Sequence, residues 1–164
     1  MRMPVGFSTW AGVVSTLLLV ALLACADEEL SPGGERYQQA ATGIVREIST
    51  RLEWLAHDNG SEANWHAAER FCRGVWRAGR SEWRLPTIDE LAGLYDPEAN
   101  VGCGDAICHL GAPIQLTSAY LWSASPQNSD RRFYFDFRFG TRLAPRLRPD
   151  LTRRVLCVRS SLVD

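Results

Sequence analysis

Four cysteines that follow residue 70 constrain the fold more than any other feature of the chain. They are Cys72, Cys103, Cys108 and Cys157. An even set of cysteines in an exported domain predicts a disulfide framework, and four cysteines allow three pairings. Cys103 and Cys108 lie in one glycine-rich stretch, VGCGDAICHLG, and can close a small ring. Cys72 would then pair with Cys157 and join the front of the domain to its last strand.

A metal site is the alternative for Cys103 and Cys108, because His109 follows them directly. Zinc sites usually have more closely paired ligands, and the sequence offers no evident fourth ligand here. An oxidising compartment also favours the disulfide. We therefore expect two disulfides and neither a metal nor another cofactor.

The first 24 residues indicate the cellular location of the protein. Arg2 is their only charged residue, and an apolar stretch runs from about Trp10 to Ala24, as in a secretory signal peptide. An uncleaved membrane anchor is the alternative, because residues 5–24 carry no charge and roughly 20 apolar residues span a bilayer. Polar residues and glycines in the first half of this stretch argue against the anchor.

Cys25 ends the apolar stretch, and the segment LLAC at residues 22–25 resembles the bacterial lipobox. The resemblance implies that Cys25 is diacylated, which anchors the protein in a membrane through its acyl chains. Ala26 follows the cysteine, as in lipoproteins of the outer membrane; a secreted or periplasmic protein is the alternative. Residues 25–36 have the polar, Pro- and Gly-containing composition of a flexible tether, and residues 161–164 form a tail.

Two helices are expected after the tether. Residues 64–75 place Trp65, Ala68, Phe71, Cys72 and Val75 on one apolar stripe, with Asn64 as the N-cap. A second helix begins at Thr87, where Thr87 and Glu90 form a capping box, and Pro97 ends it.

Strands surround these helices. Residues 43–58 alternate in part and predict two short strands with a turn near Ser49; a helix is the alternative, because Glu47 and Arg51 have i,i+4 spacing. Residues 119–125 and the segment from Arg154 predict two more strands. The clearest alternation is RFYFDFRFG, residues 132–140, whose four phenylalanines should be buried on one face while Tyr134, Asp136 and Arg138 face outward. The order predicts an α+β domain with two helices packed on short antiparallel strands.

Several of these segments together resemble the Lcl C-terminal domain family, named for Legionella collagen-like adhesins. The most specific is WRLPTIDEL at residues 83–91, and the others are LEW, WHAAERFC, YLWSAS, DFRFG and VLCVR. The motif positions are Trp83, Arg84, Leu85, Pro86, Glu90, Leu91, Trp122 and Asp136. We interpret them as packing residues, with Trp83 in the core and Arg84 paired with an acid such as Glu90.

The resemblance covers about residues 36–160, which we take as one domain at residues 37–160. It implies a C-type lectin-like fold, in which a cysteine of the first helix bonds one of the last strand, and this agrees with a Cys72–Cys157 pair. The chain departs from the family pattern at Leu156, in the cysteine-containing loop at residues 97–116, and in the Pro- and Arg-rich residues 141–153. Binding specificity is therefore the property least transferable from the family.

The sequence contains neither the motifs of calcium-dependent sugar binding nor those of common catalytic sites. The E-P-N, Q-P-D and W-N-D patterns of calcium lectins are absent, and residues 120–160 offer only three carboxylates where calcium takes six to eight oxygens. No nucleophile-elbow, phosphate-loop or H-E-x-x-H motif is present. Formylglycine-generating enzymes share the broad fold but need reactive cysteines, so they are the less favoured alternative, and we expect no enzyme.

Arginines concentrate near the end of the chain, which contains no lysine: residues 130–159 hold nine arginines and three aspartates. A solvated face is the simple interpretation, and an anion-binding face is the sharper one. The candidates for anion binding are Arg131, Arg132, Arg138, Arg142, Arg146 and Arg148. The family's adhesins bind sulfated polysaccharides, which implies an acidic polysaccharide as ligand.

The sequence therefore predicts an exported bacterial lipoprotein with a non-catalytic binding module for an acidic polysaccharide or an envelope partner. A structural component of an envelope protein complex, without a small ligand, is the alternative. Nucleic acid is excluded as a partner by the expected export.

Overall fold

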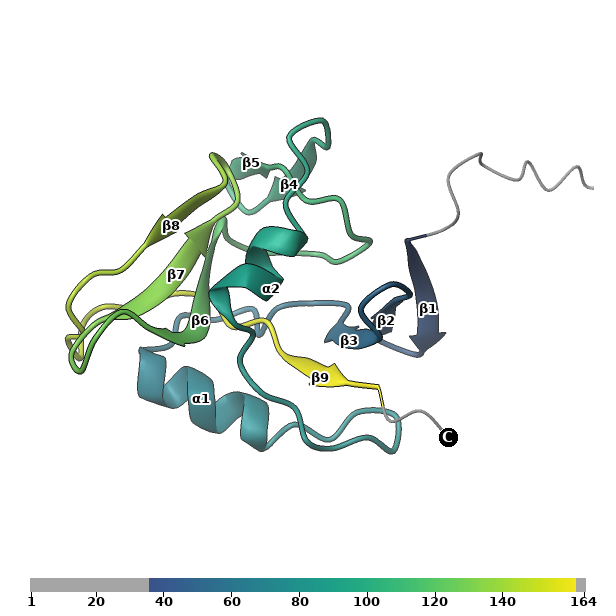
Figure 1. Cartoon of the computed structure of the whole chain (residues 1–164), viewed down its shortest axis with the longest axis horizontal. Helices are drawn as coiled ribbons and strands as arrows, with labels where there is room; N and C mark the ends of the chain where they lie inside the picture. Colours follow the sequence, from purple (N-terminus) through teal and green to yellow (C-terminus); the bar gives the residue numbers. More distant parts are fainter. Residues whose placement is uncertain (1–35, 162–164) are drawn as a thin grey trace, which may run out of the picture. The chain divides into compact units, whose positions relative to one another are not determined.

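Three small sheets and two helices make up residues 36–161, the part of the chain that the computed structural model describes (Figure 1). The predicted signal peptide, Cys25, nearly all of the tether and residues 162–164 of the tail lie outside the described residues. The described part is mixed α/β, and all strand pairs within its sheets are antiparallel. This confirms the coarse fold class expected from the sequence.

The first sheet joins the beginning of the domain to its end. Its strand order is β1 (Tyr37–Ala41), β2 (Ile44–Glu47), β3 (Leu52–Leu55) and β9 (Val158–Ser160). The two strands predicted within residues 43–58 are confirmed as β2 and β3. β1 was not predicted, because YQQAA shows no alternation of apolar and polar residues. The last strand begins at Val158 rather than at the predicted Arg154.

Both predicted helices are present, and both begin at the expected cap. In α1 (Trp65–Arg73) the Asn64 side chain accepts from the Ala67 N–H, and in α2 (Ile88–Gly93) Thr87 and Glu90 form the capping box. Two details differ from the prediction. Phe71 is exposed although it was placed on the apolar stripe, and α2 ends at Gly93, well before Pro97.

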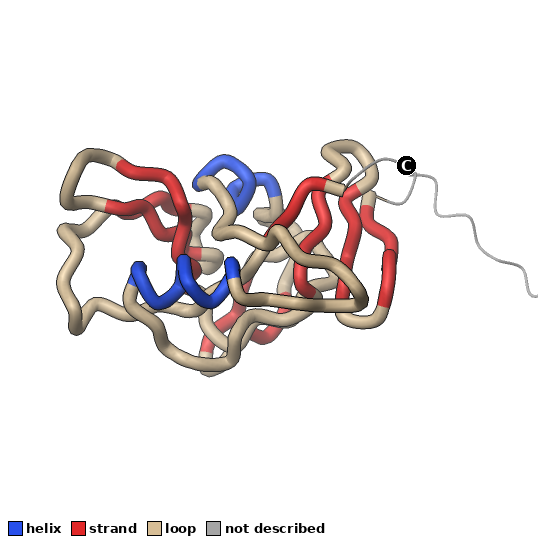
Figure 2. Tube along the Cα trace, turned by 90° about the horizontal axis from the view of Figure 1, so that it is seen from below, coloured by secondary structure: helices blue, strands red, loops and turns tan. Residues whose placement is uncertain are grey.

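The second sheet has the order β6 (Tyr120–Pro126), β7 (Arg132–Asp136) and β8 (Thr141–Leu143). Helix α1 contacts β6, and α2 contacts both β6 and β7, so the helices pack against this sheet (Figure 1). Long segments without helix or strand link the elements, as between α1 and α2 (residues 74–87) and between β8 and β9 (residues 144–157). Loops therefore make up much of the trace (Figure 2).

The face predicted for the phenylalanines is wrong in part. Phe135 and Phe137 are buried, but Phe133 is only half-buried and Phe139 is 68% exposed. Tyr134 and Asp136, predicted to face outward, are buried. The strand ends at Asp136 and residues 137–140 form a turn, so the two-residue period does not continue to Phe139.

The two disulfides have the expected pairing. Cys72 of α1 is bonded to Cys157, which directly precedes β9, and all atoms of both residues are buried. Cys103 and Cys108 close the hairpin of β4 (Val101–Cys103) and β5 (Ala106–Cys108). The first bridge closes a loop with a sequence separation of 85 and contributes roughly 4 to 5 kcal/mol in chain-entropy models; the second contributes about 2 kcal/mol.

Candidate functional site

Most of the arginines predicted to bind anions face an acid of the same domain. The six candidates lie at the start of β7 and just before it, in the turn after β7, on β8 and in the loop after β8. The ion pairs are Arg138 with Asp136 (2.8 Å), Arg142 with Asp89 (2.6 Å), Arg146 with Asp130 (2.8 Å) and Arg148 with Asp150 (3.7 Å). The run of positive charge in the sequence is thus largely compensated in space.

Arg131 and Arg132 have no carboxylate within ion-pair distance in residues 36–161. Arg131 Nη1 donates to the Ala144 carbonyl oxygen at 2.8 Å. The guanidinium carbon of Arg132 lies over the Trp65 ring, 4.7 Å from its centroid. Such a cation–π contact stabilises the packing of this end of β7 on α1.

A pocket of about 320 Å³ lies beside the N-terminal half of α1, and we call it the α1 pocket. Its lining residues are Asn64, Trp65, His66, Arg70, Leu147, Arg148 and Pro149. The loop after β8 supplies the last three, so the pocket forms where that loop passes α1. No carboxylate is among the lining residues.

Aromatic and cationic groups meet in the α1 pocket. The Trp65 ring is fixed by a hydrogen bond from its Nε1 to the Ser123 carbonyl oxygen at 2.8 Å, and the His66 ring packs edge-on at 5.2 Å between centroids. Arg70 and Arg148 are both exposed. Within residues 36–161 Arg70 has no ion-pair partner, and Arg148 has only the pair of 3.7 Å with Asp150.

The structure brings one of the six predicted arginines, Arg148, to this pocket, and Arg132 contacts the ring of its tryptophan without lining the pocket. Arg70 was not predicted from the sequence, and Trp65 was predicted only as a core residue. The four-residue spacing of His66 and Arg70 puts them on one helix face, which was a usable signal. Nothing in the sequence shows that the loop after β8 passes over that face.

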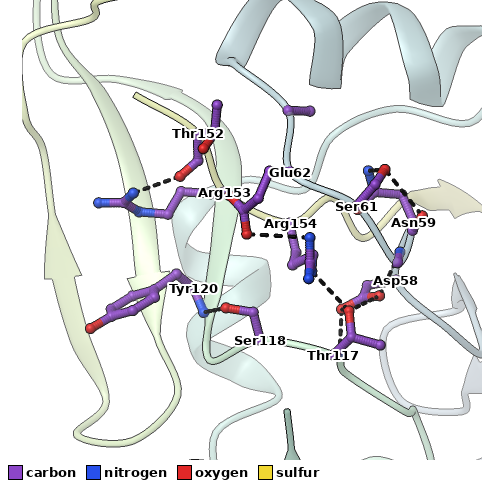
Figure 3. A network of polar contacts seen from close by, with 12 residues as sticks. Asp58, Asn59, Ser61, Glu62, Thr117, Ser118, Tyr120, Thr152, Arg153 and Arg154 are labelled. Atoms are coloured by element: carbon purple, nitrogen blue, oxygen red, sulfur yellow. Dashed lines mark hydrogen bonds and ion pairs between the residues drawn. The ribbon is translucent and has the colours of Figure 1, made fainter. Parts of the chain in front are cut away.

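A polar network ties the segment before α1 to the loops before β6 and β9 (Figure 3). Asp58 accepts from the Thr117 N–H at 2.6 Å and from the Thr117 hydroxyl, and Arg154 Nε donates to the same hydroxyl at 2.9 Å. Arg154 Nη1 also lies 3.3 Å from Glu62. The Arg153 guanidinium packs over the Tyr120 and Tyr134 rings.

This network borders a second hollow, of about 370 Å³. Its charged lining residues are Glu62, Asp105, Arg138 and Arg154. Two acids balance two arginines there, so this hollow presents no excess of either charge. It is a poorer candidate for an anion than the α1 pocket.

The residues of the WRLPTIDEL segment hold the fold together. Trp83, Leu85, Pro86 and Leu91 are buried, and Trp83 Nε1 donates to the Arg80 carbonyl oxygen at 3.1 Å. Arg84 reaches both carboxylate oxygens of Glu90, at 2.8 and 2.7 Å. Trp122 is likewise buried and donates to the Ala63 carbonyl oxygen at 2.7 Å. None of these side chains lines the α1 pocket.

The neighbours of Glu90 lower the pKa of its carboxyl group. Burial alone would raise the pKa of its carboxyl, but hydrogen bonds from Arg84 and from the Thr87 N–H outweigh burial and leave the pKa below its usual value. The same contacts complete the α2 capping box.

Groups for redox or metal chemistry are not assembled in the part of the chain that the structure describes. Its four cysteines are disulfide-bonded, and residues 36–161 contain no cluster of three or more metal-ligating side chains. His109 Nδ1 lies 2.7 Å from the Ala99 carbonyl oxygen, so this ring is engaged with the backbone. No helix between residues 36 and 161 is long and apolar enough to cross a membrane.

Comparison with known protein families places most of the described residues in one family. The model of the Lcl C-terminal domain family matches residues 43–159, which include both helices, both disulfides and all strands except β1 and the last residue of β9. No curated protein matches the chain. Because the match spans well over half of the sequence, the chain belongs to the Lcl C-terminal domain family.

Proposed function

We propose that this protein is a non-catalytic binding module of the cell envelope that takes an acidic polysaccharide in the α1 pocket. Membership of the Lcl C-terminal domain family supports an adhesin-like role at the cell surface or envelope. The observation that carries the choice of ligand is the composition of the pocket. Trp65, Arg70 and Arg148 line it together, and no acid does.

These groups fit the chemistry of an acidic sugar. The planar guanidinium forks of the exposed Arg70 and Arg148 suit a carboxylate or a sulfate. Trp65, which is 8% exposed, adds a small apolar surface for the C–H groups of a sugar ring. A pocket of about 320 Å³ is at the small end of the usual range for ligand sites, which fits one or two sugar units of a polymer.

The proposed fold is C-type lectin-like. A disulfide joins the first helix to the residue before the last strand, and β9 returns to the sheet of β1, β2 and β3. Both features support the fold that the family resemblance implied. An experimental structure with a different strand order would overturn this assignment.

The proposed location is a membrane surface, with Cys25 acylated and the outer membrane as the destination. The lipobox resemblance of residues 22–25 supports this proposal. Mass spectrometry of the N-terminal peptide should show a diacylated cysteine, and Cys25→Ser should move the protein from the membrane fraction to the soluble fraction. An unmodified thiol would remove the anchor from the proposal.

Retention on a heparin column tests the ligand. The double variant Arg70→Ala/Arg148→Ala should elute at clearly lower salt than wild type, because two of the guanidinium groups that hold the polymer are lost. Arg142→Ala/Arg146→Ala is the matched control, since it removes equal charge from arginines that lie outside the pocket. Equal losses in both variants would show non-specific attraction and no pocket.

A structural role in an envelope complex is the second candidate. Two large apolar side chains support it, because Trp76 and Phe139 are 71% and 68% exposed. Exposed aromatics are frequent anchors at protein interfaces. Pull-down from solubilised membranes should recover a partner that Trp76→Ala or Phe139→Ala loses, while heparin retention stays unchanged.

A formylglycine-generating type of enzyme is the least favoured alternative. Such chemistry needs free thiols, and all cysteines in residues 36–161 are bonded. Titration of thiols in the folded, non-reduced protein tests this alternative. A reactive thiol in this part of the chain would support an enzymatic function.

A further inference from the structure

Three adjacent strands of the first sheet place charged residues in one row. Antiparallel register sets Arg46 of β2 opposite Glu53 of β3, and Glu53 opposite Arg159 of β9. The Arg46 Nη2 nitrogen lies 2.7 Å from Glu53 Oε1, and Arg159 Nε lies 3.5 Å from Glu53 Oε2. Strand pairing alone therefore brings two arginines, distant in sequence, to one carboxylate.

A third arginine reaches the same carboxylate from the loop after α1. Arg80 Nε lies 3.0 Å from Glu53 Oε2, an ion pair without the alignment of a hydrogen bond. The loop is fixed by hydrogen bonds between Arg77 and Arg80 and by the Trp83 ring, which donates to the Arg80 carbonyl oxygen. Ala78 and Glu82 in this loop have φ of 49° and 65°, a backbone conformation that costs non-glycine residues energy.

The three arginines are not matched in charge. Glu53 is 1% exposed and offers one negative charge to three guanidinium groups, so the cluster has a net charge of +2. Among the lining residues of the described part, Glu82 is the only other acid, and its exposed side chain at the rim reduces the excess charge of this group to +1. Little water reaches Glu53 and Arg159, so the remaining positive charge is weakly screened.

The cluster opens to a pocket of about 440 Å³, which we call the Glu53 pocket. Its lining residues are Arg46, Glu53, Ala78, Gly79, Arg80, Ser81, Glu82, Arg159 and Ser161. Arg46 Nε is buried and has no hydrogen-bond acceptor in residues 36–161. A donor of this kind normally has a partner, because an unpaired buried polar group is costly.

We propose that the Glu53 pocket binds a compact oxyanion, that is a sulfate, phosphate or carboxylate group. The guanidinium groups of Arg46 and Arg80 supply donors to such a group, and Glu53 holds them in place by neutralising one charge. Arg159 adds positive charge, while its Nε and Nη1 donate to the Ser160 and Ser81 carbonyl oxygens. The pocket shares no lining residue with the α1 pocket, so this inference does not depend on the proposed polysaccharide site.

Binding of inorganic sulfate to the full chain in detergent tests the inference. Sulfate is titrated against chloride at constant ionic strength, and the backbone amide signals of residues 79–82 are followed by NMR. These signals should shift to saturation with sulfate but not with chloride. Parallel titrations with phosphate and acetate identify which oxyanion fits best.

Variants place the sulfate in the Glu53 pocket. Arg80→Gln should weaken the affinity for sulfate at least fivefold, whereas Arg142→Gln, an arginine of the second sheet, and Arg70→Ala should leave it unchanged. Glu82→Gln removes the acid at the rim and should tighten binding about twofold. Because the Glu82 side chain is exposed, this variant keeps the test valid even if Arg80→Gln fails to fold.

Either of two results overturns the inference. The amide signals of residues 79–82 do not respond to any of the three oxyanions, or they respond equally in wild type, Arg80→Gln and Glu82→Gln. Loss of heparin retention in Arg70→Ala/Arg148→Ala with sulfate binding intact would show that the two sites are separate.

Discussion

The arginines of the two sheets are compensated in opposite ways. In the second sheet and the loop after it, four of the six arginines that are crowded in sequence are matched one to one with acids. In the first sheet, arginines that are far apart in sequence share the single carboxylate of Glu53. A run of arginines in a sequence therefore does not define a positive surface, since the strand register and the position of the acids decide it.

Burial separates the two regions further. The Glu53 carboxylate is almost completely buried, whereas the Asp89 and Asp130 side chains, which pair with Arg142 and Arg146, are 79% and 45% exposed. Exposed ion pairs contribute about 0 to 1 kcal/mol, because water and salt screen them. A buried charge whose partner is removed costs several times more.

Glu53→Gln should have the largest effect in this comparison. It leaves three guanidinium groups around a neutral side chain, and Arg159 among them is buried. We expect a loss of about 3 to 5 kcal/mol in the free energy of unfolding, measured by urea denaturation of the full chain. A loss below about 1 kcal/mol would mean that the arginines turn to solvent without cost, and the contrast between the two sheets would disappear.

Asp136→Asn tests the one buried acid of the second sheet. Asp136 accepts from the backbone N–H and the side chain of Arg138, at 2.8 to 3.0 Å, but serves this single arginine. Asparagine keeps one acceptor oxygen and loses the charge, so we expect a loss of about 2 kcal/mol. Urea denaturation of Asp136→Asn and of Glu53→Gln compares the two losses of stability. A larger loss in Asp136→Asn would mean that a one-to-one pair matters more than a shared carboxylate.

The sequence predicts local structure well and this charge arrangement poorly. Both helix starts were predicted, from Asn64 and from Thr87 with Glu90, because capping depends on residues close in the chain. The Glu53 cluster depends on the pairing of β3 with β9, which no local pattern contains. Arg46 and Arg159 therefore gave no signal, although each lies in a segment that was predicted to form a strand.

The error on RFYFDFRFG has a similar origin. Tyr134 is buried because the loop before β9 returns over it, with the Arg153 guanidinium 4.3 Å from its ring centroid. Phe139 turns outward in the tight turn that ends at Gly140, whose φ is 65°. A β-carbon at Gly140 would lie 2.8 Å from the Tyr95 ring, so packing as well as φ demands glycine there. Neither the loop nor the turn can be read from alternation.

The Arg84–Glu90 pair gives a smaller, pH-dependent effect. The pKa of Glu90 is lower in the folded protein than in the unfolded chain, so its contribution to stability is complete above the unfolded value of about 4.3. That contribution disappears as the pH falls through the lowered folded pKa. Glu90→Gln should therefore be less stable than wild type at pH 7 and approach it at strongly acidic pH. A difference in the free energy of unfolding between the two proteins that stays the same at every pH would contradict this assignment.

Arg142→Ala should have the smallest effect, because its partner Asp89 is 79% exposed and lies in the first turn of α2. The N–H groups of that helix end favour the Asp89 charge even without the arginine, so we expect a loss of less than about 0.5 kcal/mol. Urea denaturation at low salt and at 1 M salt measures it, and 1 M salt should remove most of the difference. The same salt change should leave most of the Glu53→Gln deficit in place, because burial protects that carboxylate from screening. A large, salt-resistant loss in Arg142→Ala would show that the matched pairs of the second sheet also hold the fold, and exposure would then no longer separate the two regions.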